Sequence, residues 1–144
     1  NVSLKWPNDV WIDGSKCAGI LVEARPQEGW AVIGVGLNLS IADDEFPPEL
    51  QGRATSVGGD VTFTEAVEAL NRQVGQRLAA PLEETLSEFA RRDALKGRQV
   101  RWDEGTGVAA GIDRQGNLLV ESPTGCLSSL NAGEVHLSLP VDAA

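Results

Sequence analysis

The sequence predicts an α+β protein, because two regions with strand-like patterns flank one helical region. Runs rich in β-branched and aromatic residues fill residues 1–40, apolar residues at helical spacing follow in residues 64–92, and short alternating runs return from Gly97 onward. We expect a mixed β-sheet with helices on one face, followed by a small SH3-like β-barrel. The expected domains are residues 1–95 and residues 96–144.

Four strands are expected in the first region, separated by turn residues. Asp13-Gly14 stands between two β-rich runs and predicts a tight hairpin, and Gln27-Glu28-Gly29 predicts a second hairpin loop. The expected strands cover residues 2–5, 10–12, 18–24 and 30–39.

The middle of the chain changes from loop to helix. Pro47-Pro48 and Gly58-Gly59 interrupt the segment after the strands, which we expect to be mostly loop. Thr64 is the expected N-cap of a first helix, and Pro81 is expected to end it. A second helix is expected over residues 82–92.

The last region has the pattern of a small all-β unit. Glycine-containing turns separate short alternating runs, and such runs within about 45 residues are typical of a small barrel. The expected strands cover residues 99–102, 106–112, 118–121, 126–130 and 135–139.

The formal net charge of −9 is the composition feature that most restricts the partners. An acidic surface argues against binding nucleic acid through this segment and against docking on an anionic membrane. No run approaches the roughly 18 apolar residues of a membrane helix, and no signal peptide is visible, so we expect a cytoplasmic location. Cys17 and Cys126 lack CxxC spacing and are expected to be buried, reduced thiols.

The segment Lys5-Trp6-Pro7-Asn8-Asp9 is the most informative motif. It places a cation at the end of a strand, followed by a proline that fixes a turn and by two short polar side chains. A lysine in this position is suited to pairing with a carboxylate or a phosphate. The alternative for a generic string of this kind is a solvent-exposed turn after an edge strand.

Three further motifs follow in order along the chain. They are Gly14-Ser15-Lys16-Cys17-Ala18-Gly19-Ile20-Leu21-Val22-Glu23, Gly34-Val35-Gly36-Leu37-Asn38 and Ala54-Thr55-Ser56-Val57. Together with the first, they resemble the biotin–protein ligase family, whose catalytic domain has a class II synthetase-like fold. The segments Gly111-Ile112-Asp113 and Gly133-Glu134-Val135 also resemble the small terminal β-domain of that family.

The resemblance implies a two-step reaction that consumes biotin and ATP with Mg²⁺. Biotin is converted to biotinyl-5′-AMP and is then transferred to a lysine of a biotin carboxyl carrier protein. By resemblance, Lys5 is catalytic and contacts the biotin carboxylate, and Lys16 contacts the ATP phosphates. Asn38 would help to hold the nucleotide or its Mg²⁺, and Asn8 is a weaker candidate in the ATP site.

Glycines within the predicted strands have two interpretations. Gly19, Gly34 and Gly36 would cost stability in a strand, which a flat ligand such as biotin against the sheet would explain. A bulge or tight packing is the alternative. No protein ligand of a metal is assigned, because no Cys/His/Asp cluster has zinc spacing, and with His136 as the single histidine a hydrolytic triad is not expected.

The sequence departs from the family at its beginning. The family carries a Gly-Arg-Gly-Arg-x-Gly-Arg loop well upstream of the lysine motif, whereas only four residues precede Lys5 here. We therefore expect this segment alone to be inactive or nearly so. An incomplete catalytic sheet would expose an edge, which leaves association into a homodimer open.

Two alternative functions remain at this point. A lipoate or octanoyl transferase shares the fold but lacks the Trp-Pro-Asn-Asp string after its lysine. A non-catalytic binding module would engage a carrier or a partner subunit only. Binding of biotinyl-5′-AMP separates a ligase site from a module of that kind.

Overall fold

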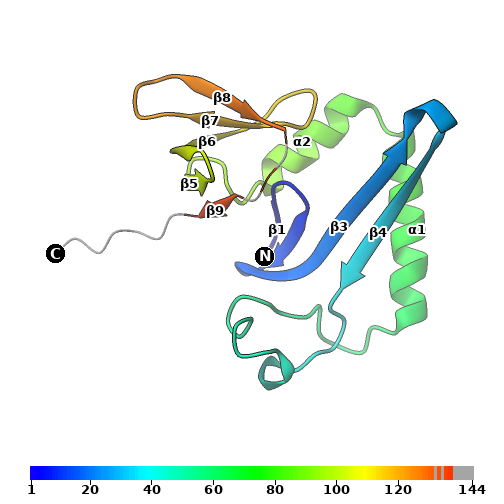
Figure 1. The fold of residues 1–144 in the computed structure, drawn as a ribbon. Coiled ribbons are helices and arrows are strands. Elements are labelled where there is room, and N and C mark those ends of the chain that lie inside the picture. The colour runs from blue at the N-terminus through cyan, green and yellow to red at the C-terminus, as the bar shows by residue number, and fades with distance from the viewer. Residues whose placement is uncertain (132, 134, 138–144) are drawn as a thin grey trace. The chain divides into compact units, whose positions relative to one another are not determined.

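The computed structural model describes residues 1–131, 133 and 135–137, and Figure 1 shows their arrangement. The chain separates into two compact units. The first comprises residues 1–4 and 8–85, and the second comprises residues 5–7 and 86–144. Both units combine helix with antiparallel strands, so the α+β class is confirmed; the expected division at residues 95 and 96 stays a prediction.

The first unit is built on a four-stranded sheet whose strands follow the order of the chain. The pairings of β2 with β3 and of β3 with β4 are antiparallel. Asp13 and Gly14 both have positive φ, 48° and 88°, as the tight hairpin predicted there requires. The strands are β1 (Val2–Lys5), β2 (Asp9–Ile12), β3 (Ser15–Arg25) and β4 (Trp30–Leu37).

Parallel pairing is limited in this unit, which corrects the expectation of a mixed sheet. Within the described residues it amounts to an isolated bridge between Lys16 and Ala54. This bridge joins the segment after the strands to the beginning of β3. The segment itself is mostly loop, as predicted, with a short 3-10 turn at Asp43–Glu45, and another such turn, Pro26–Glu28, joins β3 to β4.

Helix α1 (Phe63–Ala79) begins two residues earlier than the sequence indicated. Its N-cap is Thr62, whose side chain accepts a hydrogen bond from the Glu65 backbone, while the Glu65 carboxylate accepts one from the Thr62 backbone. This reciprocal pair is a capping box, and it outcompetes the expected cap at Thr64. The half-buried side chains of α1 recur at helical spacing on one face, at Ala66, Ala69, Leu70 and Val74.

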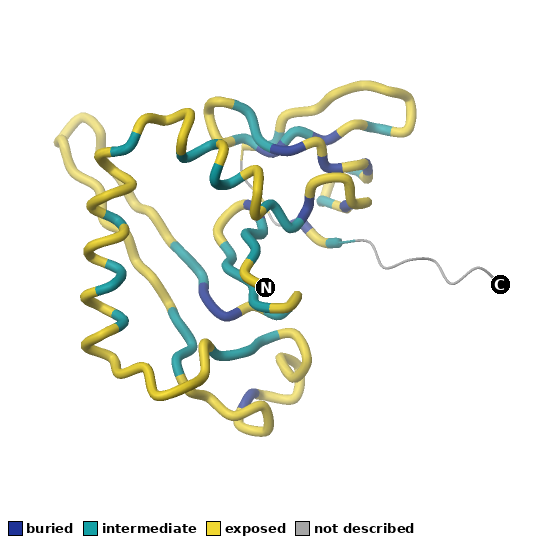
Figure 2. Tube along the Cα trace, turned by 180° about the vertical axis from the view of Figure 1, so that it is seen from behind, coloured by how far each residue is buried: buried dark blue, intermediate teal, exposed yellow. Residues whose placement is uncertain are grey.

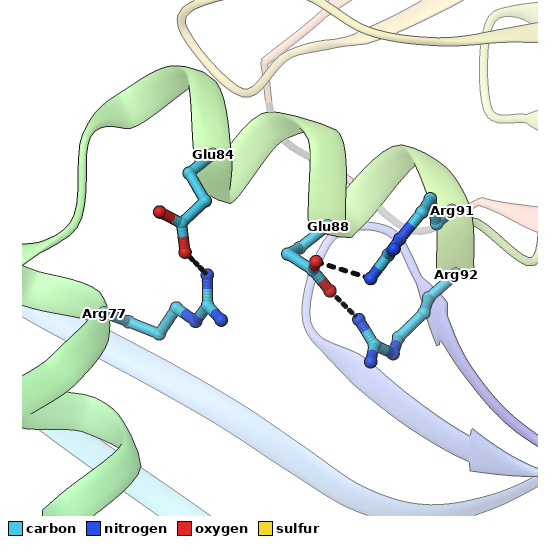
Figure 3. A network of polar contacts seen from close by, with 5 residues as sticks. All are labelled: Arg77, Glu84, Glu88, Arg91 and Arg92. Carbon is cyan, nitrogen blue, oxygen red and sulfur yellow. Dashed lines mark hydrogen bonds and ion pairs between the residues drawn. The ribbon is translucent and has the colours of Figure 1, made fainter.

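Helix α2 (Leu82–Arg92) follows Pro81, where the helical pattern was predicted to break. Ion pairs form near both of its ends (Figure 3). The Arg77 guanidinium lies 3.1 Å from the Glu84 carboxylate, and the Glu88 carboxylate pairs with both Arg91 and Arg92. These pairs lie on exposed helix surface, where each contributes little to stability.

The second unit is a five-stranded antiparallel sheet with the order β8-β7-β6-β5-β9. All five strands were predicted, although Ser138 and Leu139 of the last one lie outside the described residues. The order places β8 and β9 at opposite edges, so closure into an SH3-like barrel is not confirmed. The strands are β5 (Gln99–Trp102), β6 (Gly105–Ile112), β7 (Leu118–Glu121), β8 (Leu127–Leu130) and β9 (His136–Leu137).

Burial differs between the units, as the colours in Figure 2 show. The second unit has a continuous core in which every second residue of β6 is buried. In the first unit, the buried apolar side chains among the described residues are Cys17, Ala18 and Phe46. The core of the second unit contains Trp6, Leu95, Val100, Ala109, Leu118, Val120 and Val135.

The two cysteines differ in burial. Both cysteines are free thiols, as predicted, but only Cys17 is buried, so the expected burial of Cys126 is wrong. Burial raises the pKa of the Cys17 thiol, against a smaller opposing effect of a backbone hydrogen bond. No helix in the described part of the chain is long and apolar enough to span a membrane.

Candidate functional site

The backbone of Lys16 is hydrogen-bonded to the loop segment that carries the fourth motif, Ala54-Thr55-Ser56-Val57. The Lys16 N–H donates to the Arg53 carbonyl at 2.8 Å, and the Thr55 N–H donates to the Lys16 carbonyl at 2.9 Å. Both backbone groups of Lys16 are therefore satisfied by residues 53–55. Motifs that stand about 40 residues apart in the sequence meet at this point of the fold.

Asn38, directly after β4, is hydrogen-bonded to the same loop segment. Its N–H donates to the Cys17 carbonyl at 2.9 Å, which extends the pairing of β4 with β3 by one residue. Its side-chain Nδ2 donates to the Thr55 carbonyl at 3.0 Å, and its own carbonyl accepts from the Val57 N–H. The second, third and fourth motifs are thereby joined into one hydrogen-bonded arrangement within the first unit.

Asn8 has a backbone-binding role in the structure. Its Nδ2 donates to the Ile20 carbonyl at 2.9 Å, and its carbonyl accepts from the Ile20 N–H at the same distance. This double contact attaches the first motif to β3. The structure brings Asn8 to the same sheet as Lys16, with its amide nitrogen directed to protein backbone.

The three candidate glycines lie on adjacent strands. Gly19 of β3 pairs with Gly36 of β4, and Gly34 pairs with Leu21. A Cβ atom at Gly34 or Gly36 would meet only carbonyl oxygens, at 3.7 and 3.9 Å, which is ordinary contact. Tight packing within the described residues therefore does not explain these two glycines.

Gly19 has a different environment. A Cβ atom there would lie 3.3 Å from both Cε and Nζ of Lys16, which is closer than most real contacts. The Lys16 ammonium itself is 2.5 Å from the Asp9 carboxylate. Asp9 is a residue that the sequence interpretation left out of the site, although it stands within the first motif.

Lys5 is the last residue of β1 and is half-buried. Together with Trp6 and Pro7 it is assigned to the second unit. Trp6 is 4% exposed, belongs to the core of that unit and donates from Nε1 to the Gly116 carbonyl at 2.9 Å. Trp6 is therefore a core residue of the second unit.

The groups that the first unit presents for chemistry are few among its described residues. The unit offers the partly exposed Lys16 ammonium, which suits a phosphate, and a strip of sheet backbone without side chains at Gly34 and Gly36, which suits a flat ligand. No group of three or more His, Cys, Asp or Glu side chains that could hold a metal ion occurs in the described residues.

Comparison with protein families gives two matches, one at each end of the chain. Residues 1–40 match the sequence model of the Biotin/lipoate A/B protein ligase family, and residues 97–138 match that of the Biotin protein ligase C terminal domain. Together these matches cover more than half of the chain.

Curated relatives extend the similarity across the middle of the chain. The bifunctional ligase/repressor BirA of Escherichia coli is 32% identical over 149 residues, covering 94% of this chain and 46% of the relative. The biotin--[acetyl-CoA-carboxylase] ligase of Mycobacterium tuberculosis is 34% identical, covering 82% of this chain and 47% of the relative. The chain thus spans about half the length of these two proteins.

Solved structures agree with the sequence relatives. The biotin protein ligase from Aquifex aeolicus in complex with biotin and ATP superimposes with a TM-score of 0.80 and 25% identity, covering 95% of this chain and 62% of that chain. Its apo structure gives a TM-score of 0.82. With both family matches, the relatives and the fold in agreement, this chain belongs to the biotin protein ligase family.

Proposed function

We propose that this chain carries the nucleotide-facing strands and the C-terminal β-domain of a biotin–protein ligase. Such an enzyme activates biotin with ATP to biotinyl-5′-AMP and transfers biotin to a lysine of a carrier protein. The observation that carries the proposal is the convergence of Lys16, Asn38 and residues 54–57 on one hydrogen-bonded arrangement. Three of the four ligase motifs take part in it.

The first step requires positive charge. An oxygen of the biotin carboxylate attacks the α-phosphorus of ATP, and the bond from that phosphorus to the bridging oxygen breaks as pyrophosphate leaves with the electron pair. Both reactants are anions, so a positioned cation lowers their repulsion and stabilises the charge that develops at phosphorus. We assign this role to Lys5, and we assign contact with the ATP phosphates to Lys16.

The second step transfers the activated acyl group. The neutral amine of the carrier lysine attacks the acyl carbonyl, AMP leaves with the electron pair of the broken bond, and the new amide nitrogen loses a proton. The carrier in this proposal is a biotin carboxyl carrier protein. Its lysine needs access to the surface that holds the adenylate.

Asn38 and Asn8 are the amide groups of the proposed ATP site. Because Nδ2 of Asn38 is engaged with Thr55, its Oδ1 is the atom that we assign to the nucleotide or to Mg²⁺. Asn8 contributes by fixing the backbone of β3 at Ile20. Magnesium prefers few protein ligands when phosphate oxygens are present, so it would enter with ATP as part of the substrate.

The biotin ring is proposed to lie against the glycines of the sheet. Gly34 and Gly36 leave the strand backbone uncovered, and Gly19 stands opposite Gly36. Fused rings can approach a backbone closely only where no Cβ intervenes. This would explain glycine at strand positions where it costs stability.

The remaining parts of the proposal concern partners and location. We place the protein in the cytoplasm, with no membrane or nucleic-acid contact through this segment, in keeping with its net charge of −9. A homodimer stays open. The ligase names of the relatives favour an enzyme over a non-catalytic binding module, and the Trp-Pro-Asn-Asp string favours biotin over lipoate.

The direct test is biotin-dependent release of pyrophosphate from ATP by the natural polypeptide that contains residues 1–144. Lys5→Ala should lower the rate by about 100-fold to 1,000-fold, which is typical of removing one charge-stabilising group. Lys96→Ala, which changes a lysine outside the motifs, is the matched control and should retain the rate. A Lys5→Ala protein with normal turnover would refute the proposed role.

The same assay on residues 1–144 alone tests the expectation that this part is inactive or nearly so by itself. Binding of biotinyl-5′-AMP to the natural polypeptide separates the ligase from a binding module. A ligase should bind it, whereas a pure interaction module should not.

A further inference from the structure

A β-bulge decides where the Lys16 side chain points. In the β2–β3 pairing, Val10 stands opposite Ala18 but Trp11 stands opposite Lys16, so Cys17 is the extra residue. Residues 16 and 19 are an odd number apart and would face opposite sides of a regular strand. The bulge removes that alternation and brings the Lys16 side chain over Gly19.

Gly19 provides the space that this side chain occupies. Its φ lies outside the left-handed region, so backbone conformation does not require glycine there. The nearest atoms to a Cβ at this position are Cε and Nζ of Lys16 at 3.3 Å, followed by Oδ1 of Asp9 at 3.9 Å. An alanine would therefore push against the charged end of the lysine.

Asp9 fixes the ammonium group in this position. Asp9 pairs directly with Gly19 across the two strands, so its side chain stands beside the space above the glycine. Its Oδ1 lies 2.5 Å from Nζ of Lys16, and its side chain is 14% exposed against 48% for Lys16. A mostly covered carboxylate thus holds an ammonium that still has an open side.

We propose that Asp9 is a positioning residue that holds the Lys16 ammonium over Gly19, ready for the phosphates of ATP. A free lysine side chain loses considerable rotamer entropy when a ligand orders it. The Asp9 contact orders it in advance, which favours binding of the nucleotide. This inference rests on the proposed contact of Lys16 with ATP, and it assigns Gly19 to the lysine instead of to biotin.

The test measures pyrophosphate release by the natural polypeptide while ATP and biotin are varied separately. Asp9→Asn keeps the side-chain size but removes the charge, and it should raise KM for ATP about tenfold while changing KM for biotin less than about twofold. Gly19→Ala should act in the same direction. Asp9→Glu keeps the charge and should restore most of the affinity for ATP.

A double-mutant cycle of Asp9 and Lys16 distinguishes positioning of the lysine from a general effect on the structure. In a background of Lys16→Met, the further change Asp9→Asn should leave KM for ATP unaltered, because the group that Asp9 positions is gone. Glu28→Gln is the matched control, since Glu28, in the turn between β3 and β4, also pairs with a cation, Arg25 at the end of β3. It should leave both KM values as they are.

Three results would overturn the inference. The first is a rise in KM for ATP with Lys16→Met but not with Asp9→Asn or Gly19→Ala. The second is a rise in KM for biotin alone with Gly19→Ala, which would make this glycine part of the biotin surface. If Lys16→Met leaves the ATP dependence unchanged, the proposed role of Lys16 fails as well. Should Asp9→Asn not fold, Gly19→Ala gives the same comparison.

Discussion

The two units of this chain differ in how completely their apolar side chains are buried. The second unit has a core in which Leu95, Val100 and Leu118 are fully buried. The first unit carries three of the four motifs and the last two residues of the other, Asn8 and Asp9. Its long hairpin exposes large apolar side chains such as Leu21 and Val22, at 62% and 58%. Neighbouring residues of a strand face opposite sides, so both faces of this hairpin are exposed.

The packed core and the residues proposed to bind ATP therefore lie in different parts of the chain. Strands with apolar residues on both faces are typical of sheets that are covered on both sides. The residues proposed to bind ATP lie on this thinly covered sheet, whereas the second unit supplies the packed core. Mutations of the same type should therefore have large effects on stability in one unit and small effects in the other.

The largest expected difference is between two tryptophans. Trp6→Ala removes a core side chain and its hydrogen bond to Gly116, and it should lower the free energy of unfolding by about 3–5 kcal/mol. Trp30 is 42% exposed, and the centroid of its ring lies 5.6 Å from Cζ of Arg25. Trp30→Ala should therefore lower the free energy of unfolding by only about 0.5–1 kcal/mol. Chemical denaturation measures both, and equal costs would contradict the comparison.

Two leucines provide the next comparison. Leu118 is fully buried and Leu21 is 62% exposed. Leu118→Ala should lower the free energy of unfolding by about 2–5 kcal/mol, and Leu21→Ala by less than about 0.5 kcal/mol. A large cost for Leu21→Ala in residues 1–144 would mean that the hairpin is covered more than its exposure indicates.

Two glycines differ in the room that the structure leaves for a side chain. A Cβ atom at Gly107 would lie 2.5 Å from the Glu121 carbonyl oxygen, while one at Gly34 has its nearest neighbour at 3.7 Å. Gly107→Ala should cost about 1–3 kcal/mol, because the sheet backbone must move. Gly34→Ala should be close to neutral for stability, and thermal unfolding of both variants tests this.

The smallest expected effect is a pH dependence in the second unit. Desolvation raises the pKa of Asp113, but hydrogen bonds from Asn117, Gln115 and Ser129 outweigh it, so the net pKa is below the ordinary value. A lowered folded pKa gives stability that is present above the unfolded pKa and is lost as the pH falls through the folded one. Asp113→Asn should therefore flatten the fall in stability below about pH 4.

The control for this prediction is Asp103→Asn, in the turn between β5 and β6, which should keep the pH dependence. Unfolding by denaturant at a series of pH values measures both variants. An unchanged slope in Asp113→Asn would show that the hydrogen bonds in this turn do not favour the charged carboxylate.

Local patterns predicted most of the fold. The strands and the helix break at Pro81 follow from periodicity and turn residues, which act over a few positions. The cap at Thr62 was missed because the competing Thr64 stands close by, and the reciprocal bond with Glu65 decides between them. Pairing order and barrel closure depend on distant contacts, so the alternating pattern alone left them open.

The candidate site was predicted as a set of motifs, without its internal connections. The motifs indicated Lys16 and Asn38 as site residues. Only the fold shows that both are hydrogen-bonded to the backbone of residues 53–57. The role of Asp9 depends on the bulge at Cys17, which shifts the alternation of β3. No short-range pattern in the sequence marks that bulge.

Amide hydrogen exchange of the natural polypeptide, with and without biotinyl-5′-AMP, shows directly which unit binds the adenylate. We expect new protection at residues 16–19 and 34–38, where the motifs converge, and unchanged exchange in strands β5–β8. Protection confined to those C-terminal strands, or absent from both regions, would contradict the proposal that the adenylate binds where the motifs of the first unit converge.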